Sequence, residues 1–244
     1  TAKVIQLEMD NLLIGQNRGA DVALVGNLAC SFDEMVRVMK DDGVQIDHSA
    51  YAKELRAQEQ ALEAKLAGKQ ASDNVPIETS RFCKDIADFV AQDDNMIVIG
   101  DGGDVVAESA KVVPIPKKGL WMDPGPLGTW GVGPSFAMAA KLARPDEPVF
   151  VIYGDGSFGL NGMEYEAAAR QGIPFVGVMG NDAAWTQIRR GQVQLFGNER
   201  APATNLAFTR YDQVVEALGG HGEYVETPDQ IRPAIDRALE SGKP

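Results

Sequence analysis

Two aspartates that follow short apolar stretches have the residue type and the setting needed to bind a divalent cation. Asp155 lies in a Gly-Asp-Gly-Ser turn after the apolar residues 148–153. Asp182 is the second residue of an Asn-Asp pair after the apolar residues 175–179. Mg²⁺ takes oxygen ligands and is often held by one or two carboxylates together with phosphate oxygens. Because the glycines beside Asp155 let the backbone approach a phosphate closely, the pattern predicts a metal–diphosphate site.

The residues around the two aspartates predict a strand–helix–strand unit that brings them together. Residues 148–153 and 175–179 are expected to be strands, and residues 161–170 a helix that Gly172 and Pro174 end. Open α/β sheets bind ligands at the carboxyl ends of their parallel strands. The helix that follows the glycine turn would offer unpaired N–H groups and a partial positive charge to an anion. We therefore expect an α/β fold with a parallel sheet and a site at its carboxyl edge.

The same residues resemble a known signature. Gly154-Asp155-Gly156, followed 24 residues later by the Asn-Asp pair, is similar to the Gly-Asp-Gly and Asn-Asn signature of the thiamine-diphosphate-dependent enzymes. Residues 158–166 and 123–133 resemble more narrowly the 2-hydroxyacyl-CoA lyase and oxalyl-CoA decarboxylase branch, which is related to acetolactate synthase and benzaldehyde lyase. The resemblance extends over nearly the whole chain. It implies a parallel-sheet thiamine-diphosphate-binding domain preceded by part of a Rossmann-like middle domain.

This resemblance assigns roles to individual residues. It implies that Mg²⁺ is bound by Asp155, Asp182 and the backbone carbonyl of Ala184. It also implies that the bent cofactor is supported by the bulky side chain of Trp130 and that the carbonyl of Gly131 meets the cofactor's amino group. The remaining candidate cofactor contacts are glycine-turn residues, namely Gly102, Gly103, Gly154, Gly156 and Ser157.

Two residues depart from the family pattern. Asp182 stands where the family has a second Asn, so that oxygen ligation is kept but a negative charge is added near the diphosphate. Trp130 stands where the family has a smaller apolar side chain, often Met. Packing in the protein core is an alternative role for Trp130, and the two roles are compatible.

The resemblance also implies an activity. The expected reaction cleaves a 2-hydroxyacyl-CoA to formyl-CoA and a carbonyl compound, or runs in reverse as a ligation, or decarboxylates oxalyl-CoA. An acetolactate-synthase-like or benzaldehyde-lyase-like enzyme acting on free 2-keto acids or 2-hydroxy ketones is an alternative, and a non-catalytic cofactor-binding module is another. The glutamate that activates the cofactor is expected outside this chain, in a pyrimidine-binding domain. A homodimer or homotetramer, with the site between two subunits, is implied as well.

Composition excludes some other classes of function. The chain has 244 residues and a formal net charge of −12, which argues against nucleic-acid binding because that needs clustered Lys and Arg. Cys30 and Cys83 show neither disulfide nor metal-site spacing and suit a reducing, cytoplasmic setting. No apolar run is long enough to span a bilayer.

The chain is expected to comprise three parts. Residues 1–44 resemble the second half of the middle domain, which in some branches of the family holds ADP or FAD. Residues 45–75 are expected to be a linker helix and a connector, and residues 76–244 the thiamine-diphosphate-binding domain. Glu8 and Asp10 follow a strand where an acid could bind a ribose hydroxyl, although the sequence favours solvated loop acids.

A second Gly-Asp-Gly triplet at residues 100–102 lacks a downstream partner. The same spacing leads to residues 127–128, Leu and Gly, which offer no metal-binding side chain. Asp101 and Asp104 would repel a phosphate, and we expect them to cap a helix over residues 105–111.

Later elements follow from the apolar pattern. Residues 223–226 are expected to form a strand and residues 229–241 a helix. Arg189 and Arg190 are expected to be solvated surface arginines, with contact to an acyl-CoA phosphate as the alternative.

Overall fold

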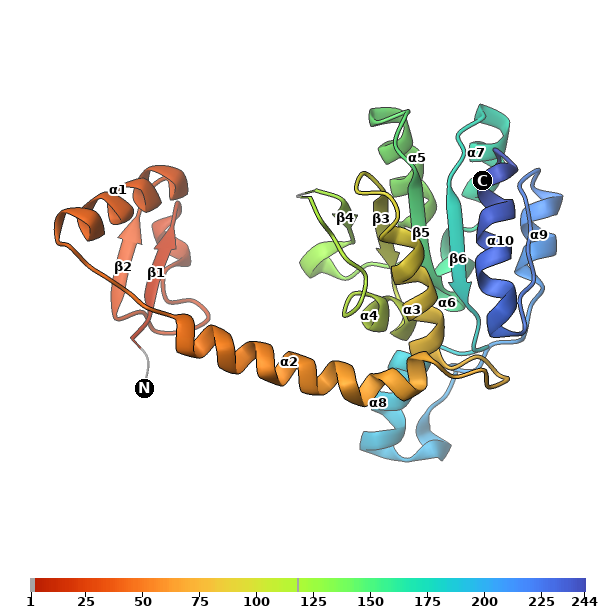
Figure 1. The fold of residues 1–244 in the computed structure, drawn as a ribbon, viewed down its shortest axis with the longest axis horizontal. Coiled ribbons are helices and arrows are strands. Elements are labelled where there is room, and N and C mark those ends of the chain that lie inside the picture. Colours follow the sequence, from red (N-terminus) through yellow and green to blue (C-terminus); the bar gives the residue numbers. More distant parts are fainter. Residues whose placement is uncertain (1–2, 118) are drawn as a thin grey trace. The chain divides into compact units, whose positions relative to one another are not determined.

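The computed structural model describes residues 3–117 and 119–244, which fall into two compact units, Thr1–Ala61 and Leu62–Pro244 (Figure 1). Helix α2 (Ser49–Gln70) contributes residues to both units. The domain boundaries expected from the sequence stay a prediction.

The first unit contains a two-stranded parallel sheet and one covering helix. Its elements are β1 (Ile5–Glu8), η1 (Asn11–Leu13), β2 (Val22–Val25) and α1 (Leu28–Asp41). Asp10 accepts a hydrogen bond from the Leu12 N–H at 2.9 Å and so caps η1, while Glu8 accepts one from the Met9 N–H at 2.8 Å. Both acids therefore make local backbone contacts, in keeping with loop acids.

Helix α2 is polar along its length. It carries charges of both signs, including an ion pair between Arg56 and Glu59 one turn apart. In the part of the chain that the structure describes, no helix combines the length and the apolar character needed to cross a membrane.

The second unit is built on a four-stranded parallel sheet with the strand order β4-β3-β5-β6. This sheet confirms the expected α/β fold class. Strand β3 is buried throughout and β5 is buried except at its last residue, which explains their continuous apolar sequences. The strands are β3 (Ile97–Asp101), β4 (Trp121–Met122), β5 (Val149–Gly154) and β6 (Val176–Gly180).

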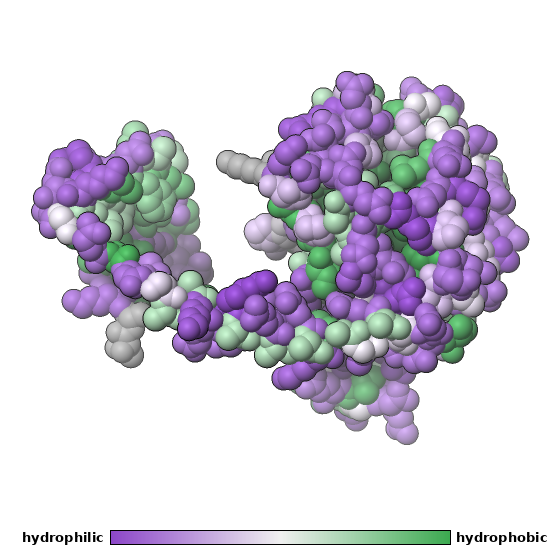
Figure 2. All heavy atoms as spheres, in the orientation of Figure 1, coloured by the Kyte–Doolittle hydropathy of each residue, from purple (hydrophilic) through white to green (hydrophobic). Residues whose placement is uncertain are grey.

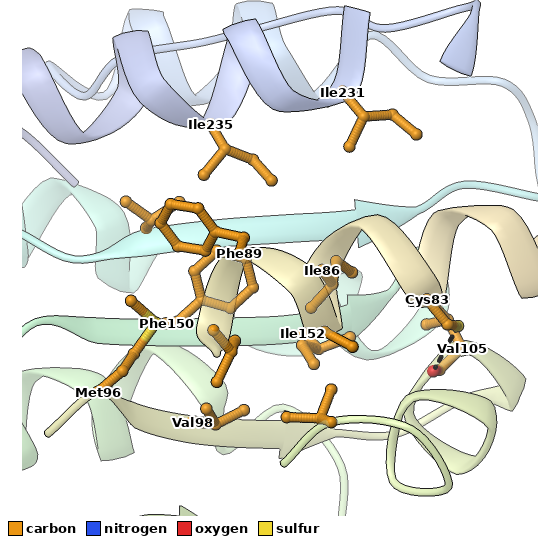
Figure 3. Close-up of a cluster of buried hydrophobic side chains, with 14 residues drawn as sticks. Cys83, Ile86, Phe89, Met96, Val98, Val105, Phe150, Ile152, Ile231 and Ile235 are labelled. Carbon is orange, nitrogen blue, oxygen red and sulfur yellow. Dashed lines mark hydrogen bonds between the residues drawn. The ribbon is translucent and has the colours of Figure 1, made fainter. Parts of the chain in front are cut away.

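Helices cover both faces of this sheet. Alternate residues of β5 point to opposite faces, and Figure 3 shows Phe150 and Ile152 among side chains of α3 and α10. Val151 and Tyr153 pack on the other side, against α5, α6, α7 and α9. The surface of this unit is mostly hydrophilic in the view of Figure 2. The helices are α3 (Thr79–Val90), α4 (Asp104–Ser109), α5 (Gly133–Ala143), α6 (Asp155–Asn161), α7 (Glu164–Gln171), α8 (Thr186–Phe196), α9 (Tyr211–Ala217) and α10 (Pro228–Glu240), with short turns η2 (Gly125–Leu127) and η3 (Asn198–Arg200).

Two expected elements differ in the structure. The helix expected over residues 161–170 begins earlier, at Asp155, and is interrupted at Gly162, where a side chain would come within 2.5 Å of the Phe158 ring. The strand expected over residues 223–226 is absent. The Glu226 N–H instead donates to the side chain of Gln230, which also completes the capping box of α10.

Asp101 does not cap a helix as the sequence suggested. It is fully buried at the end of β3, where its two carboxylate oxygens accept hydrogen bonds from the N–H groups of Gly131 and Gly133, both at 2.8 Å. Burial raises the pKa of Asp101, and these N–H groups act in the opposite direction. Nor does Asp104 cap the helix, because the N-cap of α4 is Gly103. Asp101 thus fastens the loop before α5 to the sheet.

We predict that Asp101→Ala lowers the free energy of unfolding by about 2–6 kcal/mol, because two buried N–H groups lose their acceptor. Urea unfolding of the full chain measures this change. Asp146→Ala, which truncates an exposed acid, is the control and should change stability by less than about 0.5 kcal/mol. Equal stability of the two variants would contradict the role given to Asp101.

Candidate functional site

The carboxyl ends of three neighbouring strands form one edge of the sheet. Asp101 of β3 is paired in register with Tyr153 of β5, and Gly154 of β5 with Gly180 of β6. The turns that leave these strands border a cavity of about 920 Å³. Most of the residues predicted from the sequence line this cavity, namely Gly103, Trp130, Gly154, Asp155, Gly156, Ser157, Asp182 and Ala184.

Asp155 lies at the centre of this edge, at the first position of α6. Its side chain is only 2% exposed. Oδ1 accepts a hydrogen bond from the Gly156 N–H at 2.9 Å, whereas Oδ2 is buried and has no hydrogen-bond partner in the described part of the chain. Burial, together with the negative charge of Asp182, raises the pKa of Asp155, and the N–H groups of Gly156 and Ala184 oppose that shift. Since an unpaired buried oxygen is unfavourable, a cation at Oδ2 would be stabilising.

The segment after β6 presents the second candidate ligand. Asn181 braces it, because its side chain accepts a hydrogen bond from the Ala183 N–H at 3.3 Å and donates one to the Thr209 carbonyl at 3.2 Å. Ala183 adopts a left-handed conformation, with φ of 55°, and the side chain of Asp182 is left exposed. Asn181 therefore has a structural role that sequence reasoning did not assign.

Ala184 supplies the third candidate oxygen. The hydrogen bonds around it join the Trp185 N–H to the Thr204 carbonyl at 2.8 Å and the Leu206 N–H to the Ala183 carbonyl at 2.7 Å. These bonds use the neighbouring groups and leave the Ala184 carbonyl without a donor among the described residues. That oxygen is available to a ligand.

The donor set suits a hard cation that shares its ligands with a phosphate. Within residues 3–117 and 119–244, no three His, Cys, Asp or Glu side chains are grouped as a metal site. Two carboxylates and one carbonyl oxygen are the ligand types Mg²⁺ accepts, and such a set leaves positions in its octahedral shell for phosphate oxygens.

The turns at this edge require glycine because they touch one another. The Gly154 N–H donates to the Gly102 carbonyl at 3.0 Å. Gly102 has φ of 69°, and a side chain there would come within 2.1 Å of the Ser157 hydroxyl. A side chain at Gly103 would meet the backbone of Gly154 at 3.2 Å. The two candidate glycines after β3 therefore pack directly on the turn that carries Asp155.

Two tryptophans stack beside these turns. The ring centroids of Trp130 and Trp185 lie 5.2 Å apart, and their planes are inclined by 31°. Trp185 covers Gly156, since a side chain at that glycine would come within 2.7 Å of the indole. Gly131 is buried behind Trp130, bound to Asp101, and is not among the residues that line the cavity. Sequence reasoning found Trp130 but missed Trp185, whose position directly after Ala184 was the available signal.

Arg190 is exposed, as the sequence suggested, and Arg189 is partly buried, but both side chains also have protein partners. Arg189 donates to the side chains of Asn205, at 3.1 Å, and Asn198, at 2.6 Å. Arg190 forms a salt bridge with Asp104, and both of these residues line the cavity. Arg189 thus joins α8 to the loop that follows it, and Arg190 joins α8 to the start of α4.

We predict that Gly156→Ala disrupts the Trp130–Trp185 stack, because the new methyl group would overlap the Trp185 ring. The near-ultraviolet circular dichroism of the full chain should lose intensity. Gly159→Ala is the matched control, since it lies in the same helix and no atom lies within 4 Å of the added carbon. Equal spectra for both variants would contradict the packing described for Trp185.

Comparison with known proteins agrees with this geometry. Residues 101–244 match the family described as thiamine pyrophosphate enzyme, C-terminal TPP binding domain. An acetolactate synthase large subunit from Mycobacterium tuberculosis is 36% identical over 198 residues, which cover 81% of this chain and 36% of that protein. The proteins named 2-hydroxyacyl-CoA lyase 2 from Caenorhabditis elegans and Homo sapiens are 45% identical over 148 residues and 43% identical over 140 residues.

The two lyase matches cover 60% and 57% of this chain, and 23% and 22% of those proteins. The chain therefore spans about a third or less of the length of the curated relatives it matches. The match to the cofactor-binding domain, however, includes more than half of this chain. The chain belongs to the thiamine pyrophosphate enzymes and contains their C-terminal cofactor-binding domain.

Proposed function

We propose that this chain binds thiamine diphosphate through a Mg²⁺ ion held by Asp155, Asp182 and the carbonyl of Ala184. The observation that carries the proposal is the buried Oδ2 of Asp155, which has no hydrogen-bond partner in the described part of the chain. A second carboxylate, that of Asp182, lines the same cavity, and its negative charge acts on Asp155. A divalent cation would offset both negative charges, because both carboxylates would be attracted to the cation.

The neighbouring residues would position the cofactor. The turn residues Gly103, Gly154 and Ser157 border the cavity beside the proposed metal and are suited to contact a diphosphate. When bound, thiamine diphosphate supplies a carbon nucleophile, and the protein contributes binding, orientation and electrostatics. The stacked rings of Trp130 and Trp185 would exclude water from one side of the site, with Trp130 supporting the bent cofactor.

The proposed reaction is carbon–carbon bond cleavage in a 2-hydroxyacyl-CoA, giving formyl-CoA and a carbonyl compound, or the reverse ligation. Decarboxylation of oxalyl-CoA is the related possibility. Support comes from residues 123–133 and 158–166, and from the relatives named 2-hydroxyacyl-CoA lyase 2. Action on free 2-keto acids is the second candidate, favoured by the similarity to an acetolactate synthase over 81% of this chain. A homo-oligomer, and ADP in the first unit, stay predictions.

We predict that Asp155→Ala abolishes Mg²⁺-dependent binding of thiamine diphosphate, because it removes the buried oxygen that the metal would pair with. Isothermal titration calorimetry of the full chain with and without Mg²⁺ measures the effect, and circular dichroism checks that the variant is folded. Parent-like affinity in folded Asp155→Ala would place the metal elsewhere.

A second prediction distinguishes what the oxygen ligand of Asp182 contributes to cofactor binding from what its negative charge contributes. Asp182→Asn keeps an oxygen ligand and should retain cofactor binding, whereas Asp182→Ala removes the ligand and should lose it. Because an amide oxygen attracts Mg²⁺ less strongly than a carboxylate does, Asp182→Asn should need more Mg²⁺ for half-maximal binding than the parent. Titrations of Mg²⁺ at fixed thiamine diphosphate compare the three forms. If Asp182→Ala binds like the parent, the second ligand is a different residue, and Asn181 is the first to test.

A further inference from the structure

The segment that carries two of the proposed metal ligands is bonded mainly to itself. We call residues 181–209 the α8 segment; it comprises the turn after β6, helix α8 and the loop that follows. Asn181 bonds to Thr209, Trp185 to Thr204, and Arg189 to Asn205, all within the segment. These bonds fix its internal shape. They do not fix its position relative to the turn after β3, where Asp104 lies.

A salt bridge provides that external attachment. Arg190 of α8 pairs with Asp104, the first residue of α4, across 86 positions of the chain. Among the residues the structure describes, it is the only hydrogen bond between side chains that joins the α8 segment to the rest of the unit. The Trp130–Trp185 stack is the apolar contact that accompanies it. Polar and apolar contacts therefore act together at the edge where the proposed metal binds.

The charges around the cavity give this salt bridge a second effect. Asp104, Asp155 and Asp182 all line the cavity, and an unpaired Asp104 would repel a diphosphate. Among the described residues that line the cavity, one is an arginine, Arg190, and one is a lysine, Lys243. The C-terminus, one residue after Lys243, lies near the start of β6, whereas α8 lies beyond the other end of that strand (Figure 1). Arg190 is thus the cation at the metal end, and it neutralises Asp104.

Without a metal, the α8 segment also experiences repulsion. Asp182 and Asp155 are both acids, and both line the cavity. Mutual repulsion between two carboxylates tends to move the exposed one, Asp182, away. An attachment that works before the metal arrives would keep Asp182 and the Ala184 carbonyl close to Asp155.

We propose that Arg190 and Asp104 are positioning residues: their salt bridge holds the α8 segment ready for Mg²⁺ and diphosphate, and it removes the repulsion that Asp104 would exert. The inference rests on the proposed function as far as the ligand is concerned. The attachment itself can be tested without any ligand.

The test compares Arg190→Gln with Arg200→Gln, a matched control that removes the same charge from the exposed end of the same segment. In the ligand-free full chain, hydrogen exchange of residues 186–196 should be faster in Arg190→Gln by roughly threefold to fivefold, the range of a partly exposed ion pair. Arg200→Gln should exchange like the parent. Equal exchange in all three proteins would overturn the attachment, whatever the chain binds.

Binding of thiamine diphosphate provides the second part of the test. In calorimetry with Mg²⁺, Arg190→Gln should bind thiamine diphosphate more weakly than the parent by roughly threefold to fivefold. Arg190→Lys, which keeps the charge, should recover part of the loss, and the exchanged pair Asp104→Arg with Arg190→Asp should recover more. Rising salt should shrink the difference between parent and Arg190→Gln, because the pair is screened.

The outcomes separate the two claims. Faster exchange in Arg190→Gln together with no Mg²⁺-dependent binding by the parent would support the attachment and refute the proposed function. Strong binding by the parent with equal affinity for Arg190→Gln would leave the proposed function intact and overturn the positioning role.

Discussion

A carboxylate oxygen buried without a hydrogen-bond partner is unfavourable, and the fold places one at the end of its central strand. Asp155 follows β5, whose first five residues are wholly buried, so its carboxylate has little access to water. Gly156 satisfies Oδ1 but not Oδ2. The surrounding segments pack closely on the turn that carries Asp155, which accounts for the glycines after β3 and for the indole of Trp185 packed on Gly156. In the proposed function, a metal ion would supply the positive charge that pairs with Oδ2.

The two Gly-Asp-Gly triplets of this chain show how one local sequence serves two purposes. Both aspartates are buried at the carboxyl ends of neighbouring parallel strands, Asp101 as the last residue of β3 and Asp155 directly after β5. Asp101 receives two backbone N–H groups from the loop that carries Trp130, so both of its oxygens are satisfied and it fixes that loop. Asp155 keeps an unsatisfied oxygen beside a second acid. The difference lies in the segments that fold onto each aspartate, and not in the triplet itself.

Local pattern predicted most of the fold, the resemblance to a known family suggested the candidate site residues, and the features that were missed depend on long-range contacts. A continuous apolar run predicted β5 because buried parallel strands need no polar alternation, and a similar run predicted β6, of which only the first residue is buried. The role of Asp101 was missed because its partners are 30 and 32 residues away. The partner of Arg190 was missed for the same reason, since Asp104 is 86 residues distant. The stacking of Trp185 was not predicted because its contact with Trp130 depends on how two loops meet.

The central claim is that the buried Oδ2 of Asp155 binds the metal that anchors the diphosphate. Its most direct test is an anomalous-diffraction map of crystals of the full chain grown with Mn²⁺ and thiamine diphosphate, Mn²⁺ standing in for Mg²⁺. We expect a single strong peak bonded to Oδ2 of Asp155 and shared with Asp182 and the Ala184 carbonyl. Diphosphate density whose bound metal lies away from Asp155, or a cofactor held without any metal peak, would contradict the account.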